Sequence, residues 1–311
     1  PRLLNALAHL HHQTLGFPLL LLRSQENSDY LACIAEAAQR FQPDEVSLYG
    51  GDYHVMGDTV SLMPASDANR PFTSQGGVHF ADWIEPEQLF GCVRQYKDRI
   101  QPEPGLIHRA NGGTLILTAN TLLAQPLLWL RLRKCIEQGR FDWYSQDERQ
   151  PLPVAIPSLP LQLRLILCGD RDALASFQEL DAEVHEMALY SEFEENLQIN
   201  DEEDMTFWCQ WTLTQAEEAG LDQPDADFWP LLITEAVRFT GDQETLPLCP
   251  RWLRRQLQET ALHGDSINAE ALKDALEARE WRESYLAERM RDEILLNQIM
   301  IETEGEVVGQ I

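Results

Sequence analysis

One short stretch of the chain constrains its fold more than any other. Gly112-Gly113 ends a loop and opens the run Thr114-Leu-Ile-Leu-Thr118, which is short, uninterrupted and apolar. A parallel strand buried on both faces has this composition, because helices cover both sides of its sheet. Leucines then recur at helical spacing through residues 120–136. The order of strand and helix predicts an α/β fold, with a parallel sheet and flanking helices.

A second strand and helix of the same kind stand near the start of the chain, at residues 17–22 and 30–40. Proteins that bind nucleoside triphosphates place glycines, a lysine and a serine or threonine between such elements, because backbone amides and the lysine hold the phosphates. In this frame Arg23 and Ser28 take the glycine positions, Asp29 the lysine position and Tyr30 the hydroxyl position. The whole candidate loop reads Arg23, Ser24, Gln25, Glu26, Asn27, Ser28, Asp29, Tyr30.

The strand at residues 114–118 lacks the second half of such a site. Nucleotide hydrolysis needs an Asp that holds Mg²⁺ and a Glu that orients water at the end of this strand. Thr118 and Ala119 take these positions. Glu26 and Asp29 add two carboxylates where a triphosphate would lie, and like charges repel. We expect no cofactor and no metal, with ATP and Mg²⁺ bound only if a divergent pocket works. The alternative is an ordinary strand, turn and helix unrelated to phosphate binding.

The segments around these strands resemble a known family. The residues that carry the resemblance are Glu87-Gln-Leu-Phe-Gly91, Pro104-Gly-Leu-Ile-His-Arg-Ala-Asn-Gly-Gly-Thr-Leu-Ile-Leu117 and Gln125-Pro-Leu-Leu-Trp129. Together they resemble the AAA+ (ATPase-like) module of bacterial Lon protease homologues, which are similar to the archaeal membrane-type Lon branch. The resemblance implies an AAA+ core, a helical lid and a linker helix, followed by a serine protease domain with a Ser-Lys dyad.

The resemblance also implies a domain organisation. We expect an α/β core at 1–190, a helical lid at 191–280 and a linker at 281–311 that leads to a protease domain absent from this sequence. Within the core, an insert at 44–104 is expected to hold a β-hairpin that turns at Gly57-Asp58. Its second strand is 59–63, and its first is either 45–49 or 53–56. Archaeal relatives carry membrane spans in this region, which here is polar, so we expect none.

Further site positions follow from the same resemblance. A strand at 159–169 ends at Asp170, where active AAA+ proteins place a polar sensor, although a turn after a strand favours Gly-Asp for local reasons. Arg251, Arg254 or Arg255 matches the position of a nucleotide-sensing arginine in the lid, with a purely structural role as the alternative. The lid helices are expected at 202–219, 228–240 and 250–263, followed by a final lid helix and a linker helix within 270–302.

Composition limits the partners. The net charge is -27, from 24 basic and 51 acidic residues. Such a field repels phosphate backbones, so nucleic acid is not expected as a partner. Six cysteines show no short paired spacing, and four of them read as reduced packing residues of a cytoplasmic protein: Cys33, Cys135, Cys168 and Cys209. We expect protein substrates and the absent peptidase domain as partners, a ring in the full-length protein, and a monomeric or weakly associated fragment.

The sequence leaves three functions open. The first is a Lon-family AAA+ module in ATP-dependent proteolysis that has lost nucleotide binding and acts as a scaffold or gate for the peptidase. The second is a working ATP-dependent unfoldase motor with a divergent pocket. The third is a free-standing interaction module. The chain contains no G-x-S-x-G, S-x-x-K or H-E-x-x-H motif, so we assign no catalytic residue within it.

Overall fold

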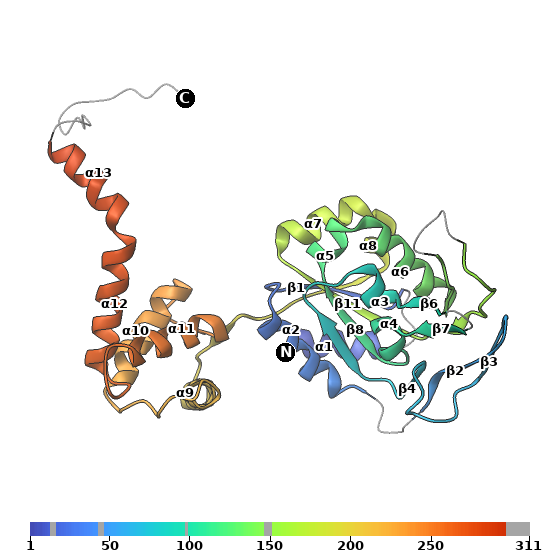
Figure 1. Cartoon of the computed structure of the whole chain (residues 1–311). Coiled ribbons are helices and arrows are strands. Elements are labelled where there is room, and N and C mark those ends of the chain that lie inside the picture. Colours follow the sequence, from blue (N-terminus) through green and yellow to red (C-terminus); the bar gives the residue numbers. More distant parts are fainter. Residues whose placement is uncertain (13–16, 43–46, 97–98, 146–150, 297–311) are drawn as a thin grey trace. The chain divides into compact units, whose positions relative to one another are not determined.

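A computed structural model describes residues 1–12, 17–42, 47–96, 99–145 and 151–296 of the chain (Figure 1). The chain divides into two compact units, Pro1–Glu194 and Glu195–Ile311. The first is an α/β unit and the second is mainly helical. The predicted boundary between lid and linker, at residue 280, stays a prediction.

A five-stranded parallel sheet forms the centre of the first unit (Figure 1). Its strands, in spatial order, are β12 (Leu189–Glu192), β1 (Leu19–Arg23), β11 (Arg164–Gly169), β8 (Thr114–Thr118) and β5 (Val78–Ala81). All residues of β8 are buried, as its apolar run predicted. The expected α/β fold is therefore confirmed.

Helices cover both faces of this sheet. On one face lie α1 (Arg2–His11) and α2 (Ser28–Gln39), which pack on Leu20, Ile116 and Ile166. On the other face, Leu21, Leu117 and Leu167 pack against four helices, α5 (Ala119–Ala124), α6 (Pro126–Gln138), α7 (Arg171–Leu180) and α8 (Ala182–Met187). Successive side chains of a strand point to opposite faces, so each apolar strand contributes to both layers.

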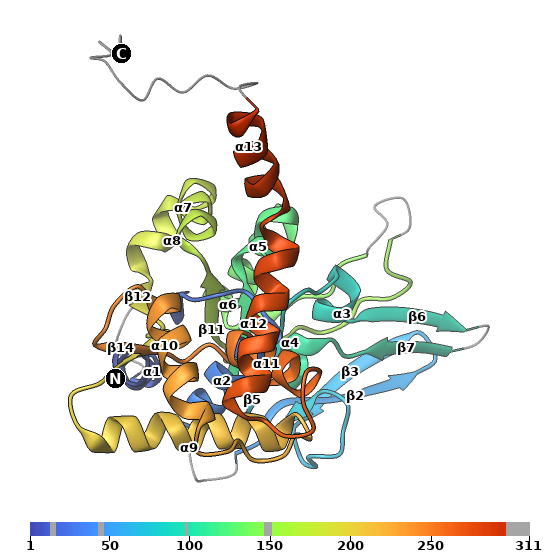
Figure 2. The same cartoon turned by 90° about the vertical axis from the view of Figure 1, so that its left-hand side faces the viewer.

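Short strands and helices complete the first unit. The predicted hairpin is present as β2 (Tyr49–Met56) and β3 (Thr59–Pro64), and β2 also pairs with β4 (Thr73–Ser74). The alternative first strand 45–49 begins outside the described residues. A second hairpin lies beside it, with β6 (Cys92–Tyr96) and β7 (Arg99–Glu103) (Figure 2). The remaining elements are α3 (Pro86–Phe90), α4 (Leu106–Arg109), β9 (Arg140–Phe141) and β10 (Leu159–Pro160).

Three expectations for the first unit were wrong in detail. The single helix expected over 120–136 is two helices, because Pro126 has no amide hydrogen to continue the first and instead opens α6. The strand expected at 159–169 is split, since Leu159–Pro160 pairs with β9 and only Arg164–Gly169 joins the main sheet. Cys33 is exposed, because it lies on the outer side of α2.

The second unit packs helices around an apolar core that includes Trp208, Leu232, Leu253 and Leu272. Its helices are α9 (Glu202–Glu218), α10 (Phe228–Thr240), α11 (Pro250–Ala261), α12 (Ala269–Glu283) and α13 (Tyr285–Leu295), with the short strands β13 (Asn196–Gln198) and β14 (Thr245–Pro247). No helix in the described part of the chain is long and apolar enough to cross a membrane.

The final lid helix and the linker helix expected within 270–302 correspond to α12 and α13, with Ser284 between them. The Ser284 hydroxyl lies 2.9 Å from Glu288 Oε1 and 3.3 Å from the Trp281 carbonyl oxygen, within hydrogen-bond distance of both. A serine hydroxyl that bonds locally competes with the helical backbone, which accounts for the break. The expected last turns of the linker helix, at 297–302, lie outside the described residues.

Ile116 provides a test of the sheet. Its side chain is fully buried against α1 and α2, so Ile116→Ala removes apolar contacts and leaves a cavity. We expect it to lower the free energy of unfolding by about 2–5 kcal/mol, measured by chemical denaturation followed by circular dichroism. Leu127→Ala is the control, because Leu127 is 80% exposed and its truncation should cost less than about 0.5 kcal/mol. Equal stability of Ile116→Ala and the parent would show that β8 is misplaced.

Candidate functional site

The strand register brings the two candidate segments to one edge of the sheet. Arg23 of β1 lies opposite Gly169 of β11, and Cys168 of β11 lies opposite Thr118 of β8. The carboxyl ends of these three strands are therefore level. The loop that follows β1 and the residues that follow β8 meet over the end of β11, the position where open α/β sheets bind ligands.

Gly169 is where the two segments approach most closely. A Cβ atom built on Gly169 would lie 3.0 Å from the Ala119 Cβ and 3.2 Å from Glu26 Oε1. Both distances are shorter than ordinary van der Waals contacts. The end of β11 therefore leaves room for the Glu26 carboxylate only because residue 169 has no side chain.

Glu26 occupies the middle of this edge. Its carboxylate is half-buried and accepts hydrogen bonds from the side chain and backbone of Asn120, while Oε1 has no hydrogen-bond partner within the described residues. Burial raises the pKa of Glu26; the Asn120 hydrogen bonds oppose this rise and the nearby charge of Asp170 adds to it. The edge thus holds a carboxylate that already lacks full solvation, a setting unfavourable to a further anion.

The loop after β1 provides a capping residue for the amino terminus of α2. The Asn27 side chain accepts a hydrogen bond from the Tyr30 amide at 3.2 Å, and its Nδ2 donates to Gln25 Oε1 at 3.4 Å. Ser24 is buried, and its amide donates to the Gly169 carbonyl oxygen at 2.9 Å. Asp29 lies in the first turn of α2, where a negative charge is favourable to the helix dipole. The Ser24 and Tyr30 amides are therefore engaged by protein acceptors, Gly169 and Asn27 respectively.

Thr118 and Ala119 are structural in this arrangement. The Thr118 hydroxyl lies 2.9 Å from the Asp82 carbonyl oxygen and 2.8 Å from the Thr121 hydroxyl, which itself lies 3.0 Å from the same carbonyl. Thr118 also caps α5 by accepting from the Thr121 amide. Ala119 is fully buried. These hydroxyls join the ends of β8 and β5.

The outer positions of the loop also have structural contacts. Arg23 is exposed, and its Nη1 lies 3.2 Å from Glu192 Oε1 at the end of β12. Tyr30 is buried, with its ring 5.2 Å from the ring of Phe193 in an edge-on contact. Ser28 is exposed at the start of α2. Arg23 and Tyr30 thus fasten the loop to the β12 side of the sheet.

The candidate sensors take local roles. Asp170 is the N-cap of α7 and accepts from the Ala173 amide at 2.8 Å, as expected of a turn residue after a strand. In the second unit, Arg254 on α11 donates to Gln215 Oε1 at 3.1 Å and lies 3.4 Å from Glu218 Oε2. Arg251 is an exposed residue at the start of the same helix.

The loop that precedes β8 is organised by two buried polar residues. His108 Nδ1 accepts from the Gly105 amide at 2.9 Å, and burial, helped by the charge of Arg131, lowers the pKa of His108 to about 3. Asn111 Nδ2 donates to the Pro160 carbonyl oxygen and its Oδ1 accepts from the Gln162 amide, both at 2.8 Å. The segment therefore positions β8 against β11 through side-chain contacts.

Sequence reasoning did not identify Asn120, Thr121 and Asp82 as parts of this edge. Asn120 directly follows the two replaced positions, at the start of a predicted helix. Its contact with Glu26 joins residues far apart in the sequence. A polar residue next to Thr118 and Ala119 was the one available signal.

The charge of Glu26 gives a test with a defined pH dependence. Because the folded-state pKa of Glu26 is raised above 4.5, its ionised form destabilises the folded state at pH 8. This cost disappears as the pH falls through the folded-state pKa towards 4.5. Glu26→Gln should therefore raise the melting temperature at pH 8, with a gain that shrinks on acidification. Glu36→Gln is the control, because the Glu36 side chain is 78% exposed. A gain that is absent, or constant with pH, would contradict this geometry.

Comparison with known proteins identifies relatives of the whole chain. Residues 80–191 match the family described as "LonB-like, AAA domain". A Lon protease homologue of Escherichia coli (strain K12) is 51% identical over 313 residues, which cover 100% of this chain and 53% of the relative. A Lon protease homologue of Haemophilus influenzae (strain ATCC 51907 / DSM 11121 / KW20 / Rd) is 31% identical over 314 residues, which cover 97% of this chain and 51% of the relative.

Solved structures are more distant. NtrX from Brucella abortus in complex with ADP aligns with 86% of this chain and 52% of its own, at 14% identity and a TM-score of 0.48. A second NtrX structure gives 14% identity and a TM-score of 0.49. This likeness is too slight to support an inference. The present chain spans about half the length of its curated relatives, contains a LonB-like AAA domain and belongs to the Lon protease homologues.

Proposed function

We propose that this chain is the AAA module of a Lon-type protease homologue that no longer binds or hydrolyses ATP. It serves as a scaffold or gate for a Ser-Lys peptidase domain in the part of the protein outside this sequence. The observation that carries the proposal is the half-buried Glu26 carboxylate over Gly169, at the edge where a triphosphate would have to enter.

The loop lacks the means to compensate a triphosphate charge. Residues 24–30 contain no lysine or arginine, and Arg23 already faces Glu192 at 3.2 Å. To receive a phosphate, α2 would have to release its Asn27 cap, which costs about 1 kcal/mol. The phosphate would then lie beside Glu26. Every step towards the usual binding mode is therefore unfavourable.

The end of β8 supports the same conclusion. The Thr118 hydroxyl is within hydrogen-bond distance of the Asp82 carbonyl oxygen and Thr121, and Ala119 has no polar atom in its side chain. Neither residue can orient water as a glutamate would, and no carboxylate replaces the aspartate that holds Mg²⁺. The Asp170 carboxylate is occupied as a helix cap. The site retains the frame of an ATPase without its reactive groups.

This role implies partners and a setting. The module would hold or guide unfolded protein substrates and contact the peptidase domain, as part of a ring in the full-length protein. The charge of -27 opposes association of the isolated fragment, because copies of it repel one another. A monomeric or weakly associated fragment and a cytoplasmic location are part of this proposal.

Proteolysis by the full-length protein tests the function. We expect degradation of an unfolded substrate such as reduced casein at the same rate with and without Mg·ATP, because the module contributes no ATP-driven step. Glu26→Gln in the full-length protein should leave this rate within about twofold of the parent. Replacement of the predicted peptidase serine is the negative control.

An increase of about tenfold or more on addition of ATP would refute the loss of nucleotide use. Absence of proteolysis under every condition, with the protein folded, would refute the role as scaffold or gate of a peptidase.

A further inference from the structure

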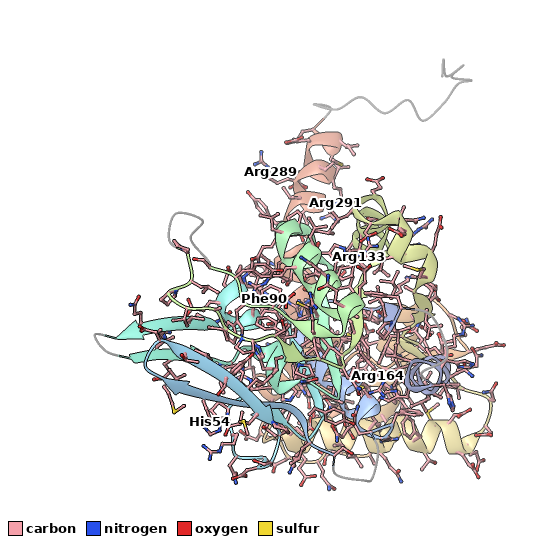
Figure 3. All side chains as sticks on the ribbon, turned by 90° about the vertical axis from the view of Figure 1, so that its right-hand side faces the viewer. His54, Phe90, Arg133, Arg164, Arg289 and Arg291 are labelled. Carbon is pink, nitrogen blue, oxygen red and sulfur yellow. The ribbon has the colours of Figure 1, made fainter. Side chains whose placement is uncertain are left out.

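A cavity of about 350 Å³ lies at the opposite, amino edge of the sheet. It is lined by the beginnings of strands, including Pro18 before β1 and Arg164, the first residue of β11 (labelled in Figure 3). The β11 strand separates it from Gly169 by about 16 Å, at roughly 3.3 Å per residue. The cavity is thus distinct from the candidate nucleotide edge, and a ligand bound in it would be independent of the proposed function.

The charge of this cavity is opposite to that of the chain. Arg164 is half-buried, and among the described lining residues none is an aspartate or glutamate, although the whole chain carries -27. Within the described residues Arg164 forms no ion pair. Burial lowers the pKa of Arg164, as expected of a cation that has lost part of its solvation. An unpaired, partly buried guanidinium is stabilised when an anion binds to it.

The remaining walls define the rest of a ligand. Tyr49 lies beside Arg164. Its ring packs directly against Gly112, where a Cβ atom would lie only 2.1 Å from the ring. His9 and His12 add polar groups at one side. Most other lining residues are apolar and include Leu10, Phe17 and Leu163. The cavity therefore combines one cationic side chain with walls that are partly polar and partly apolar.

We propose that this cavity binds an amphiphilic monocarboxylate, with its carboxylate on the Arg164 guanidinium and Tyr49 and its hydrocarbon part against the leucines. Arg164 is the one permanently charged side chain among the described lining residues, so a single negative charge is matched and a phosphate dianion is not. The planar guanidinium also matches a carboxylate with two parallel hydrogen bonds. The ligand has two possible sources, a free small organic acid or the carboxyl terminus of a peptide with an apolar last residue.

Titration of the protein with small probe molecules tests the proposal. Binding is measured by calorimetry and by changes in the amide chemical shifts of the protein. The probes are hexanoate, hexanamide, and the tripeptide Ala-Ala-Leu with a free or an amidated carboxyl terminus. We expect saturable binding of at least one free carboxylate, with shifts at Gly112 and Gly113 and none at Gly169. Binding of hexanoate alone assigns a free acid as the source, and binding of the free tripeptide alone assigns a peptide terminus. Binding of both hexanoate and the free tripeptide supports the site and shows that it accepts a carboxylate from either source.

Variants show whether Arg164 carries the binding. Arg164→Met should weaken it about tenfold or more, as expected for loss of a charged hydrogen bond, and Arg164→Lys should weaken it less. Arg140→Met is the control and should bind as the parent does, since Arg140 is exposed and pairs with Asp142. Tyr49→Phe provides a second test that keeps the ring on Gly112. No saturable binding of either free carboxylate, equal affinity for the amides, or unchanged affinity in both Arg164 variants would overturn the proposal.

Discussion

Parallel pairing of β1, β11 and β8 is the constraint on which the rest of the first unit depends. It places Arg23, Gly169 and Thr118 at one level, so that the residues after each strand meet at a single edge. The apolar side chains of these strands fill both layers of the core. Since each strand contributes to both layers, its packing alone maintains the framework.

Side-chain hydrogen bonds stabilise the edge where these strands end. Asn27 caps α2, the Thr118 and Thr121 hydroxyls lie by the Asp82 carbonyl oxygen, and Asp170 caps α7. Each of these side chains satisfies a backbone group that would otherwise lie exposed at a strand or helix end. The ends of these strands and helices are therefore capped by side chains of the same edge. Glu26 differs from these residues, because one of its carboxylate oxygens has no hydrogen-bond partner among the described residues and burial raises its pKa.

The sequence predicted the parts of this fold that depend on local composition. Apolar runs predicted β1 and β8, and the turn at Gly57-Asp58 predicted the β2–β3 hairpin. The β6–β7 hairpin was missed, because Cys92–Glu103 mixes charged residues with Pro102 and has no turn glycine between its strands. Pro126 was present in the sequence as a signal for the break between α5 and α6, and the leucine spacing across it concealed that signal.

The sequence predicted where the candidate site lies, but not which residues are in contact there. Strand order placed Thr118 and Ala119 opposite the loop after β1, because parallel strands end at a common edge. The Asn120 contact with Glu26 and the role of Gly169 needed the tertiary structure, since each joins separate βα units. The Arg164 cavity needed it too, because its lining comes from the starts of strands and from α1.

Loss of nucleotide binding is the central claim, and equilibrium binding of a fluorescent ATP analogue measures it most directly. The titration is followed by fluorescence anisotropy with millimolar Mg²⁺, and competition with unlabelled ATP separates binding at a nucleotide site from adsorption of the dye. The account predicts no saturable, ATP-competed rise in anisotropy for the parent chain. A saturable rise that unlabelled ATP reverses would contradict it.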